Sequence, residues 1–395
     1  MRFKPQNIYV FCDLIRNFAE KSMIQRIIKH HIKNKLKDNK AIIILGARQV
    51  GKTTLIQSLF ENQKNIMYWN GDETDIREML EKPTSTRLKN LIGKSKILVI
   101  DEAQRISNIG VCIKLIIDNI PSVKVIATGS SSFELSYKIK ESLTGRKWEF
   151  NLFPISFEEM VKHHGLQAEK RLLEQRLIYG YYPEIITNPD TAKERLKLIA
   201  DSYLYKDVLM WENIKKPDKL EKLIKALSLQ IGNEVSYNEL AETCGLDNET
   251  VERYINILEK SFVLYKLEPY SNNLRNELKK KRKIYFYDNG IRNAVINNFA
   301  PLNHRNDKGA LFENFVITER LKYLHYHNKN WNRYFWRNTN QQEVDYIEIN
   351  QKYLYAYEIK FSEKAKVKIP STFINQYHPS DTQIINVSNY FDIIS

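Results

Sequence analysis

Residues 46–54 read Gly46-Ala47-Arg48-Gln49-Val50-Gly51-Lys52-Thr53-Thr54 and follow an apolar run, Ala41 to Leu45. This spacing of glycines, lysine and threonine, between a predicted strand and a predicted helix, is typical of a phosphate-binding loop. Glycine lets the backbone curl, so that its N–H groups and the N-terminus of the helix face phosphate oxygens. We expect all nine residues to contact a nucleotide, with Lys52 reaching the β- and γ-phosphates and Thr53 supplying a hydroxyl to Mg²⁺.

A second apolar run, Ile97 to Ile100, leads directly into two carboxylates, Asp101 and Glu102. At the end of a buried strand, Asp101 would contact Mg²⁺ directly or through water, and Glu102 would orient and activate the attacking water. The alternative interpretation is an acidic turn. No Asn-Lys-x-Asp or Thr-Lys-x-Asp signature for guanine follows in the sequence, which favours ATP over GTP.

Two more polar positions follow predicted strands or turns. The run from Lys124 to Ala127 ends in Thr128, whose hydroxyl would sense the γ-phosphate; a polar turn is the alternative. Arg146 follows Gly145 and is a candidate arginine finger or sensor, because a guanidinium can neutralise charge on the transferred phosphoryl group. It could act in its own subunit or on a neighbour, and an ordinary surface arginine fits the spacing equally well.

The remaining pattern predicts a change of architecture along the chain. Residues 23–36 have the pattern of an amphipathic helix, and strands are expected at 41–45, 65–69, 97–100 and 124–128. Their alternation with helices predicts a doubly wound parallel sheet. After Pro154 the chain becomes mostly helical, and residues 218–287 have the order of a winged helix, three helices and then two strands.

Further motifs extend beyond the loop. They are Asp101-Glu102-Ala103-Gln104, Thr128-Gly129-Ser130-Ser131, Gly145-Arg146, Leu152-Phe153-Pro154-Ile155-Ser156-Phe157, Gly180-Tyr181-Tyr182-Pro183-Glu184 and Tyr205-Lys206-Asp207-Val208. Together with the loop they resemble a family of bacterial and archaeal AAA-type ATPases, whose members carry a C-terminal domain of uncertain role similar to restriction endonucleases. The resemblance covers nearly the whole chain after residue 22 and implies an ATPase with such a domain.

The C-terminal region carries a second set of candidate catalytic residues. Folding the chain about a turn at 350–352 places Asp345 beside Glu358 on neighbouring strands, with Lys360 on the same face as Glu358. The two carboxylates would hold Mg²⁺, Lys360 would position a water, and Glu313 on the preceding helix would complete the site. This arrangement resembles the active site of restriction-endonuclease-like nucleases; a solvated strand face is the alternative.

The predicted fold class is therefore α/β, with a P-loop sheet, a helical and winged-helix region, and a restriction-endonuclease-like domain. The expected units are an N-terminal extension (1–22), an ATPase core (23–155), a helical lid or linker (156–218), a winged-helix-like domain (219–300) and the restriction-endonuclease-like domain (301–395).

Composition indicates which partners to expect. The formal net charge of +14 favours an acidic partner such as DNA, and Lys279 to Lys283 would lie along phosphates as the wing of the winged helix or form a solvated loop. The helix at 248–260 is acidic, so packing or homo-oligomerisation is as good an interpretation as base reading. The sequence has no apolar run of membrane-spanning length, and three scattered cysteines indicate reduced thiols, so we expect a cytoplasmic protein that does not enter membranes.

Two functions fit these patterns. The first is an ATPase, using ATP and Mg²⁺, coupled to a DNA-associated C-terminal region that could act as a metal-dependent nuclease. The second is a nucleotide-switched signalling or scaffold protein whose nuclease-like domain binds without cutting.

Overall fold

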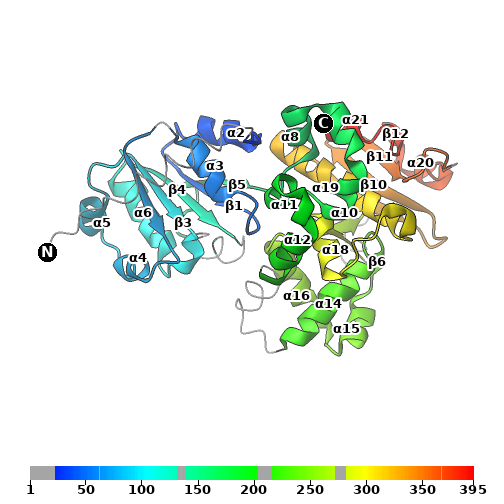
Figure 1. The fold of residues 1–395 in the computed structure, drawn as a ribbon, viewed down its shortest axis with the longest axis horizontal. Helices are drawn as coiled ribbons and strands as arrows, with labels where there is room; N and C mark the ends of the chain where they lie inside the picture. Colours follow the sequence, from blue (N-terminus) through cyan, green and yellow to red (C-terminus); the bar gives the residue numbers. More distant parts are fainter. Residues whose placement is uncertain are drawn as a thin grey trace.

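The computed structural model describes residues 23–61, 63–130, 135, 139, 141–202, 216–271, 282–365 and 367–395. The extension 1–22, Ser131, the motif from Tyr205 to Val208, and Lys279 to Lys281 of the basic hairpin lie outside the described residues. Figure 1 shows a first sheet at one end of the molecule, and a second sheet with most of the helices at the other. No helix in the described part of the chain combines the length and the apolar character that a membrane crossing requires.

The first sheet is parallel and five-stranded, with the strand order β2-β3-β4-β1-β5. Its strands are β1 (Ala41–Leu45), β2 (Ile66–Asn70), β3 (Ile97–Asp101), β4 (Lys124–Gly129) and β5 (Lys147–Asn151). Every residue of the central β1 is buried, which is why this strand has a continuous apolar sequence rather than an alternating one. The structure confirms the predicted α/β class with a parallel sheet.

Helices connect these strands. They are α3 (Lys52–Leu59), α4 (Thr74–Met79), α5 (Ser85–Ile92) and α6 (Ile109–Asn119). The sequence pattern did not reveal β5, because this edge strand is only partly buried and lacks an apolar run. The helix predicted over 23–36 is observed only as α2 (Ile28–Lys35), since the residues before it make tertiary contacts: the backbone N–H of Ile27 donates to Glu159 at 2.9 Å.

A helical region follows β5, as predicted. Its helices are α8 (Phe157–His164), α9 (Leu166–Arg171), α10 (Leu173–Tyr179), α11 (Pro183–Thr187) and α12 (Ala192–Ala200). A capping box starts α8: the side chain of Ser156 accepts from the N–H of Glu159, and the side chain of Glu159 accepts from the N–H of Ser156. The segment between β5 and α8 is therefore tightly fixed.

The second sheet has the strand order β12-β11-β10-β9-β7-β8-β6. The elements of this half are α14 (Pro217–Leu229), β6 (Glu234–Val235), α15 (Tyr237–Cys244), α16 (Asn248–Lys260), β7 (Leu264–Pro269), β8 (Arg282–Phe286), α18 (Asn289–Val295), α19 (Lys308–Tyr326), β9 (Asn332–Arg337), β10 (Glu343–Asn350), β11 (Tyr353–Ile359), α20 (Ser371–Tyr377), β12 (Asp381–Ile385) and α21 (Phe391–Ile394). Because β7 pairs with β9, the segments 219–300 and 301–395 share one sheet.

The long helix α19 is buried over most of its length, including several charged residues. Each of these charges has a partner: Arg320 forms a bidentate pair with Glu348, with both distances 2.7 Å, and Lys322 pairs with Glu319 at 2.7 Å. Buried charges are tolerated only when they are paired in this way. The helix consequently has a fixed rotation about its axis.

Candidate functional site

The loop at 46–54 lies at the carboxyl edge of the first sheet, between β1 and α3. A Cβ atom at position 46 would lie 2.2 Å from the carbonyl oxygen of Leu152, so only glycine fits there. Gly51 has a φ of +94°, a left-handed conformation that glycine adopts without strain, and α3 begins at the next residue. Both glycines are thus required by the curl of the backbone.

Lys52 folds back over this loop. Its Nζ donates to the carbonyl oxygens of Gly46 and Ala47, each at 2.9 Å, and the residue is 6% exposed. The other loop side chains differ in environment: Arg48 is half-buried, Gln49 and Thr54 are exposed, and Val50 is buried. Lys52 is therefore held against the backbone of its own loop.

Asp101 joins the loop to the neighbouring strand ends. Its carboxylate accepts a hydrogen bond from Oγ1 of Thr53 at 3.1 Å and further bonds from the hydroxyls of Thr128 and Tyr68. Parallel strands bring their carboxyl ends to one edge, which explains how residues so far apart in sequence meet. A hydroxyl and a carboxylate so placed are the hard oxygen ligands that Mg²⁺ prefers.

The sequence did not identify Tyr68 as a site residue. Tyr68 lies near Asp101 because β2 pairs with β3, which sequence spacing does not reveal. Burial, together with the hydrogen bond to Asp101, raises the pKa of Tyr68. Its hydroxyl is therefore a permanent donor to Asp101 at neutral pH.

Glu102 occupies an unusual backbone conformation, with φ +46° and ψ +43°. Its N–H donates to Oδ1 of Asp101 and to Oγ1 of Thr128, both at 3.2 Å. Its carboxylate accepts from Nε2 of the buried Gln104, which also donates to Oγ of Ser130 at 3.0 Å. Strained backbone of this kind persists only where surrounding contacts enforce it, and it is concentrated at functional sites.

Arg146 lies elsewhere. It precedes β5 at the amino edge of the sheet, where its carbonyl accepts from the N–H of Ala41 at 2.9 Å, and its Nε pairs with Asp118 at 2.9 Å. The five residues of β5 separate it from the loop by roughly 15 Å. Within its own subunit, Arg146 therefore does not reach the loop.

A cleft of about 420 Å³ opens beside the loop. Its walls include Gly51 and Thr54 of the loop, Met23 and Ile24 from the segment before α2, and Pro183 at the start of α11. The cleft thus lies between the first sheet's domain and the helical region, directly next to the expected phosphate position.

In the C-terminal half the structure brings three predicted residues together. The pairing of Tyr346 with Tyr357 in register sets Asp345 opposite Glu358. Nζ of Lys360 lies 2.9 Å from Oδ2 of Asp345 and 2.7 Å from Oε1 of Glu358. The juxtaposition expected from folding the chain about the turn is observed.

Lys283, on β8, joins these residues to the predicted Glu313. Its Nζ lies 3.2 Å from Oε1 of Glu313 and 3.9 Å from Oδ1 of Asp345, and it also pairs with Glu343. We call the six residues Lys283, Glu313, Glu343, Asp345, Glu358 and Lys360 the charged cluster. Lys283 is 2% exposed, so its expected place on a DNA-facing wing is wrong: burial of its ammonium among carboxylates turns it inward.

The charged cluster contains four carboxylates and two lysines, and its Glu313 has a raised pKa chiefly because of burial. Burial raises that pKa to about 7; Lys283 opposes the rise, and Asp345 adds to it. One carboxylate oxygen of Glu358 is buried without a hydrogen-bond partner among the described residues. Across the described part of the chain, no group of three or more His, Cys, Asp or Glu side chains is placed to hold a metal ion.

Comparison with known proteins supports the N-terminal half of this description. Residues 38–161 match a family model described as an AAA domain. Residues 170–302 and 308–390 match two models, each described as a domain of unknown function (DUF8612 and DUF4143).

Relatives and solved structures extend the comparison. An uncharacterised protein of Haemophilus influenzae is 26% identical over 311 residues, which cover 71% of this chain and 74% of the relative. An uncharacterised protein of Methanocaldococcus jannaschii is 24% identical over 360 residues, covering 86% of this chain and 78% of the relative. The Walker-type ATPase of Pyrococcus abyssi has a TM-score of 0.50 at 13% identity, covering 69% of this chain and 96% of that one, a likeness of fold.

The sheet, the loop and the matched model indicate the class: residues 38–161 match the AAA-domain model and have the parallel sheet and phosphate loop of a P-loop ATPase domain. The restriction-endonuclease-like character of 301–395 stays a prediction.

Proposed function

We propose that this chain binds and hydrolyses ATP with Mg²⁺ at the 46–54 loop, and that the nucleotide controls the C-terminal half. The observation that carries the proposal is the contact of Thr53 with Asp101 at 3.1 Å, directly beside the buried Lys52. Thr53 and Asp101 would hold Mg²⁺, and Lys52 would exchange its loop carbonyl partners for phosphate oxygens.

Glu102 is the proposed base, or the residue that orients the attacking water. Its backbone is fixed by Asp101 and Thr128, and its side chain by Gln104. Thr128, which donates to the carboxylate of Asp101 and accepts from the N–H of Glu102, would sense the γ-phosphate. The cleft beside Gly51 and Thr54 is of suitable size and apolar character for the nucleoside.

Two substitutions test this site. Lys52→Ala should abolish nucleotide binding, because the phosphates lose their principal cation, whereas Glu102→Gln should bind ATP and fail to turn it over. Isothermal titration with ATP and a phosphate-release assay in Mg²⁺ measure the two properties. Unchanged turnover in both variants rejects the proposal.

For Arg146, the exposed position supports action on a neighbouring subunit of a homo-oligomer. Its side chain is 42% exposed despite the pair with Asp118, so it is accessible to another chain. Mixing Arg146→Ala with Lys52→Ala tests this: turnover regained in the mixture requires that arginine and loop come from different subunits.

For the C-terminal half we propose association with DNA, which the net charge of +14 favours. The charged cluster could then serve either of two functions. The contacts of Lys360 with Asp345 and Glu358 favour a metal-dependent nuclease. The contacts of Lys283 with three carboxylates favour the second function, a nucleotide-switched scaffold that binds without cutting, because an ammonium ion already neutralises part of the cluster.

One experiment separates these functions. Wild-type protein and the double variant Asp345→Asn/Lys360→Met are incubated with ATP, Mg²⁺ and linear, supercoiled or single-stranded DNA, and both DNA breaks and phosphate release are measured. Cleavage by the wild type that the double variant loses, with ATP turnover intact, supports the nuclease. Absence of breaks in every DNA form supports the scaffold.

A further inference from the structure

One arginine outside the loop, Arg26, contacts both the phosphate loop and the C-terminal half of the chain. Arg26 lies just before α2, and its side chain is only 9% exposed. It donates through each nitrogen of its guanidinium: Nε to Oε1 of Glu159 at 3.1 Å, Nη1 to the carbonyl of Val50 at 2.8 Å, and Nη2 to the carbonyl of Phe153 at 2.6 Å and the hydroxyl of Tyr326 at 3.3 Å. These four acceptors belong to four different parts of the chain. Arg26 therefore connects elements that sequence spacing does not relate.

The contact with Val50 bears on the phosphate loop. A trans peptide is planar, and its C=O and N–H point in opposite directions. When Arg26 holds the carbonyl of Val50, the N–H of Gly51 is consequently turned away from Arg26. Nη1 of Arg26 would lie 3.8 Å from a Cβ atom at Gly51, so the guanidinium packs directly against this peptide.

Glu159 fixes Arg26 in place. It is fully buried, and besides Arg26 it accepts hydrogen bonds from the N–H groups of Ile27 and Ser156, both at 2.9 Å. Burial lowers the pKa of Arg26, but the charge of Glu159, the neighbouring Tyr326 and the hydrogen bonds to both together outweigh it, and the net pKa is raised. The guanidinium is thus a permanently charged group that Glu159 holds beside the Val50–Gly51 peptide.

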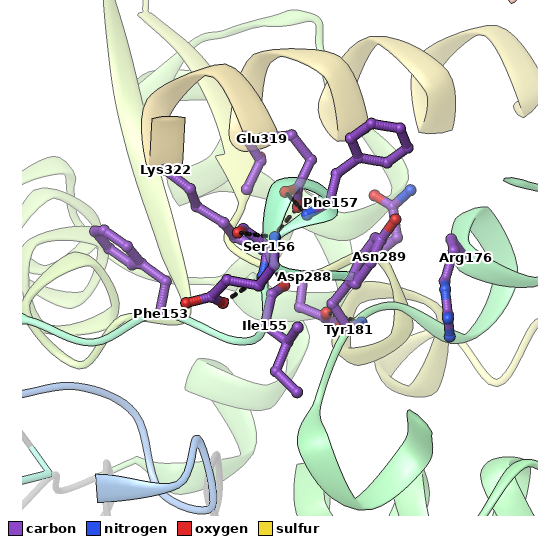
Figure 2. Close-up of polar contacts among 12 residues, drawn as sticks. Phe153, Ile155, Ser156, Phe157, Arg176, Tyr181, Asp288, Asn289, Glu319 and Lys322 are labelled. Atoms are coloured by element: carbon purple, nitrogen blue, oxygen red, sulfur yellow. Dashed lines mark hydrogen bonds and ion pairs between the residues drawn. The ribbon is translucent and has the colours of Figure 1, made fainter. Parts of the chain in front are cut away.

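The fourth contact leads to α19. Tyr326 is the last residue of this helix, and its hydroxyl also accepts from the N–H of Phe153 at 3.3 Å. Figure 2 shows how the segment after Phe153 continues along the same helix: Glu319 accepts from the N–H of Phe157 at 2.7 Å, and Lys322 donates to the carbonyl of Ile155 at 3.1 Å. The segment that leaves the first sheet, residues 153–157, is therefore hydrogen-bonded to the C-terminal half of α19.

The other end of α19 carries Glu313 of the charged cluster. The helix is continuous from Lys308 to Tyr326, and Glu313 lies about 20 Å from Tyr326 along the axis. A buried helix with paired charges can shift as a unit, so a displacement at Tyr326 would be carried along α19 to Glu313.

We propose that Arg26 is a positioning residue that holds the Val50–Gly51 peptide for phosphate binding and, through Tyr326, transmits the state of the loop to α19 and the charged cluster. This inference rests on the proposed nucleotide site. Phosphate binding that shifts the Val50–Gly51 peptide would change the contacts of Arg26. Through Tyr326, this change would alter the position of α19.

The test uses the full chain with ADP as the probe. Affinity is measured by titration calorimetry well below the melting temperature of each variant, and hydrogen exchange is followed across residues 319–328 with and without ADP. Arg26→Lys keeps the charge but cannot reach all four acceptors. Tyr326→Phe removes one hydroxyl, and Tyr323→Phe, on the same helix, is the matched control.

We expect Arg26→Lys to bind ADP about tenfold more weakly, because one charge-assisted hydrogen bond orients the loop peptide. Tyr326→Phe should bind ADP within about twofold of wild type and lose the ADP-dependent change in exchange at 319–328. Tyr323→Phe should behave as wild type in both assays. Glu159→Gln, which loosens the anchor of Arg26, is the second variant for the loop and should also weaken ADP binding.

The possible outcomes are distinguishable. A purely structural role would lower the melting temperature of the Arg26 and Glu159 variants and leave ADP affinity unchanged, which would overturn the positioning role. An ADP-dependent change in exchange that persists in Tyr326→Phe would overturn the transmission. Failure of the wild type to bind ADP would reject the nucleotide site itself, whereas wild-type binding with unaffected variants rejects the role of Arg26 alone.

Discussion

Replacing Glu313 with glutamine should stabilise the protein at neutral and alkaline pH. The side chain of Glu313 is only 14% exposed and lies beside Asp345 and Glu343, and its pKa rises from 4.5 to about 7 despite the nearby Lys283. The folded protein therefore holds this proton up to about pH 7, whereas the unfolded chain releases it near pH 4.5. Between these values the native state binds more protons, so the free energy of unfolding falls as pH rises.

The size of the effect follows from the change in pKa. A rise from 4.5 to about 7 corresponds to roughly 3 kcal/mol at pH values above 7 and to none below 4.5. Glu313 accepts hydrogen bonds from Nζ of Lys283 at 3.2 Å and from the hydroxyl of Tyr285, on β8, at 2.6 Å. Glutamine keeps the shape and an acceptor oxygen for these donors but does not titrate. The free energy of unfolding of Glu313→Gln should consequently exceed that of wild type by about 2 to 3 kcal/mol at pH 8, a difference that disappears toward pH 4.5.

Urea titrations followed by tryptophan fluorescence, at half-unit steps from pH 4.5 to 8, measure this difference. Glu348→Gln is the matched control, because this buried glutamate pairs with Arg320 at 2.7 Å and its replacement leaves the buried guanidinium without a carboxylate to balance its charge. The control should be destabilised at pH 8, by about 3 kcal/mol. A difference between Glu313→Gln and wild type that does not depend on pH would refute this account of the charged cluster.

Three further outcomes are expected. Gly46→Ala should lose ATP binding in calorimetry, because the added Cβ meets the carbonyl of Leu152 at 2.2 Å; Gly309→Ala, in open space, should bind as wild type. Lys283→Met should lower the free energy of unfolding by about 3 to 5 kcal/mol in urea, since it leaves buried carboxylates uncompensated. Arg146→Ala should leave the ADP dissociation constant unchanged, because this residue lies at the opposite edge of its own sheet and an arginine from a neighbour would meet the γ-phosphate, which ADP lacks; a tenfold weaker affinity would contradict that placement.

The phosphate loop could be predicted from sequence because its chemistry is local. Gly46, Gly51, Lys52 and Thr53 lie within nine residues, and the backbone shape that binds phosphate is a property of that short segment. The partnership of Asp345 with Glu358 was also accessible, since a tight turn between two strands fixes which residues face each other.

Other features had no local signal. β5 is a half-exposed edge strand, and its pattern resembles that of a loop. Lys283 looks like part of a basic hairpin until the pairing of β7 with β9 joins that hairpin to the C-terminal strands and turns the lysine toward Glu313. Arg26 is one cation among many in a basic segment.

The sequence by itself determined the nucleotide loop, the carboxylates that end β3, and the α/β class, because each depends on residues that are close along the chain. Only the tertiary structure decided which distant charges share a site: Arg26 with the loop and α19, and Lys283 with the charged cluster. The physical reason is that a buried charge must find a partner wherever packing places one, and sequence distance does not enter that requirement.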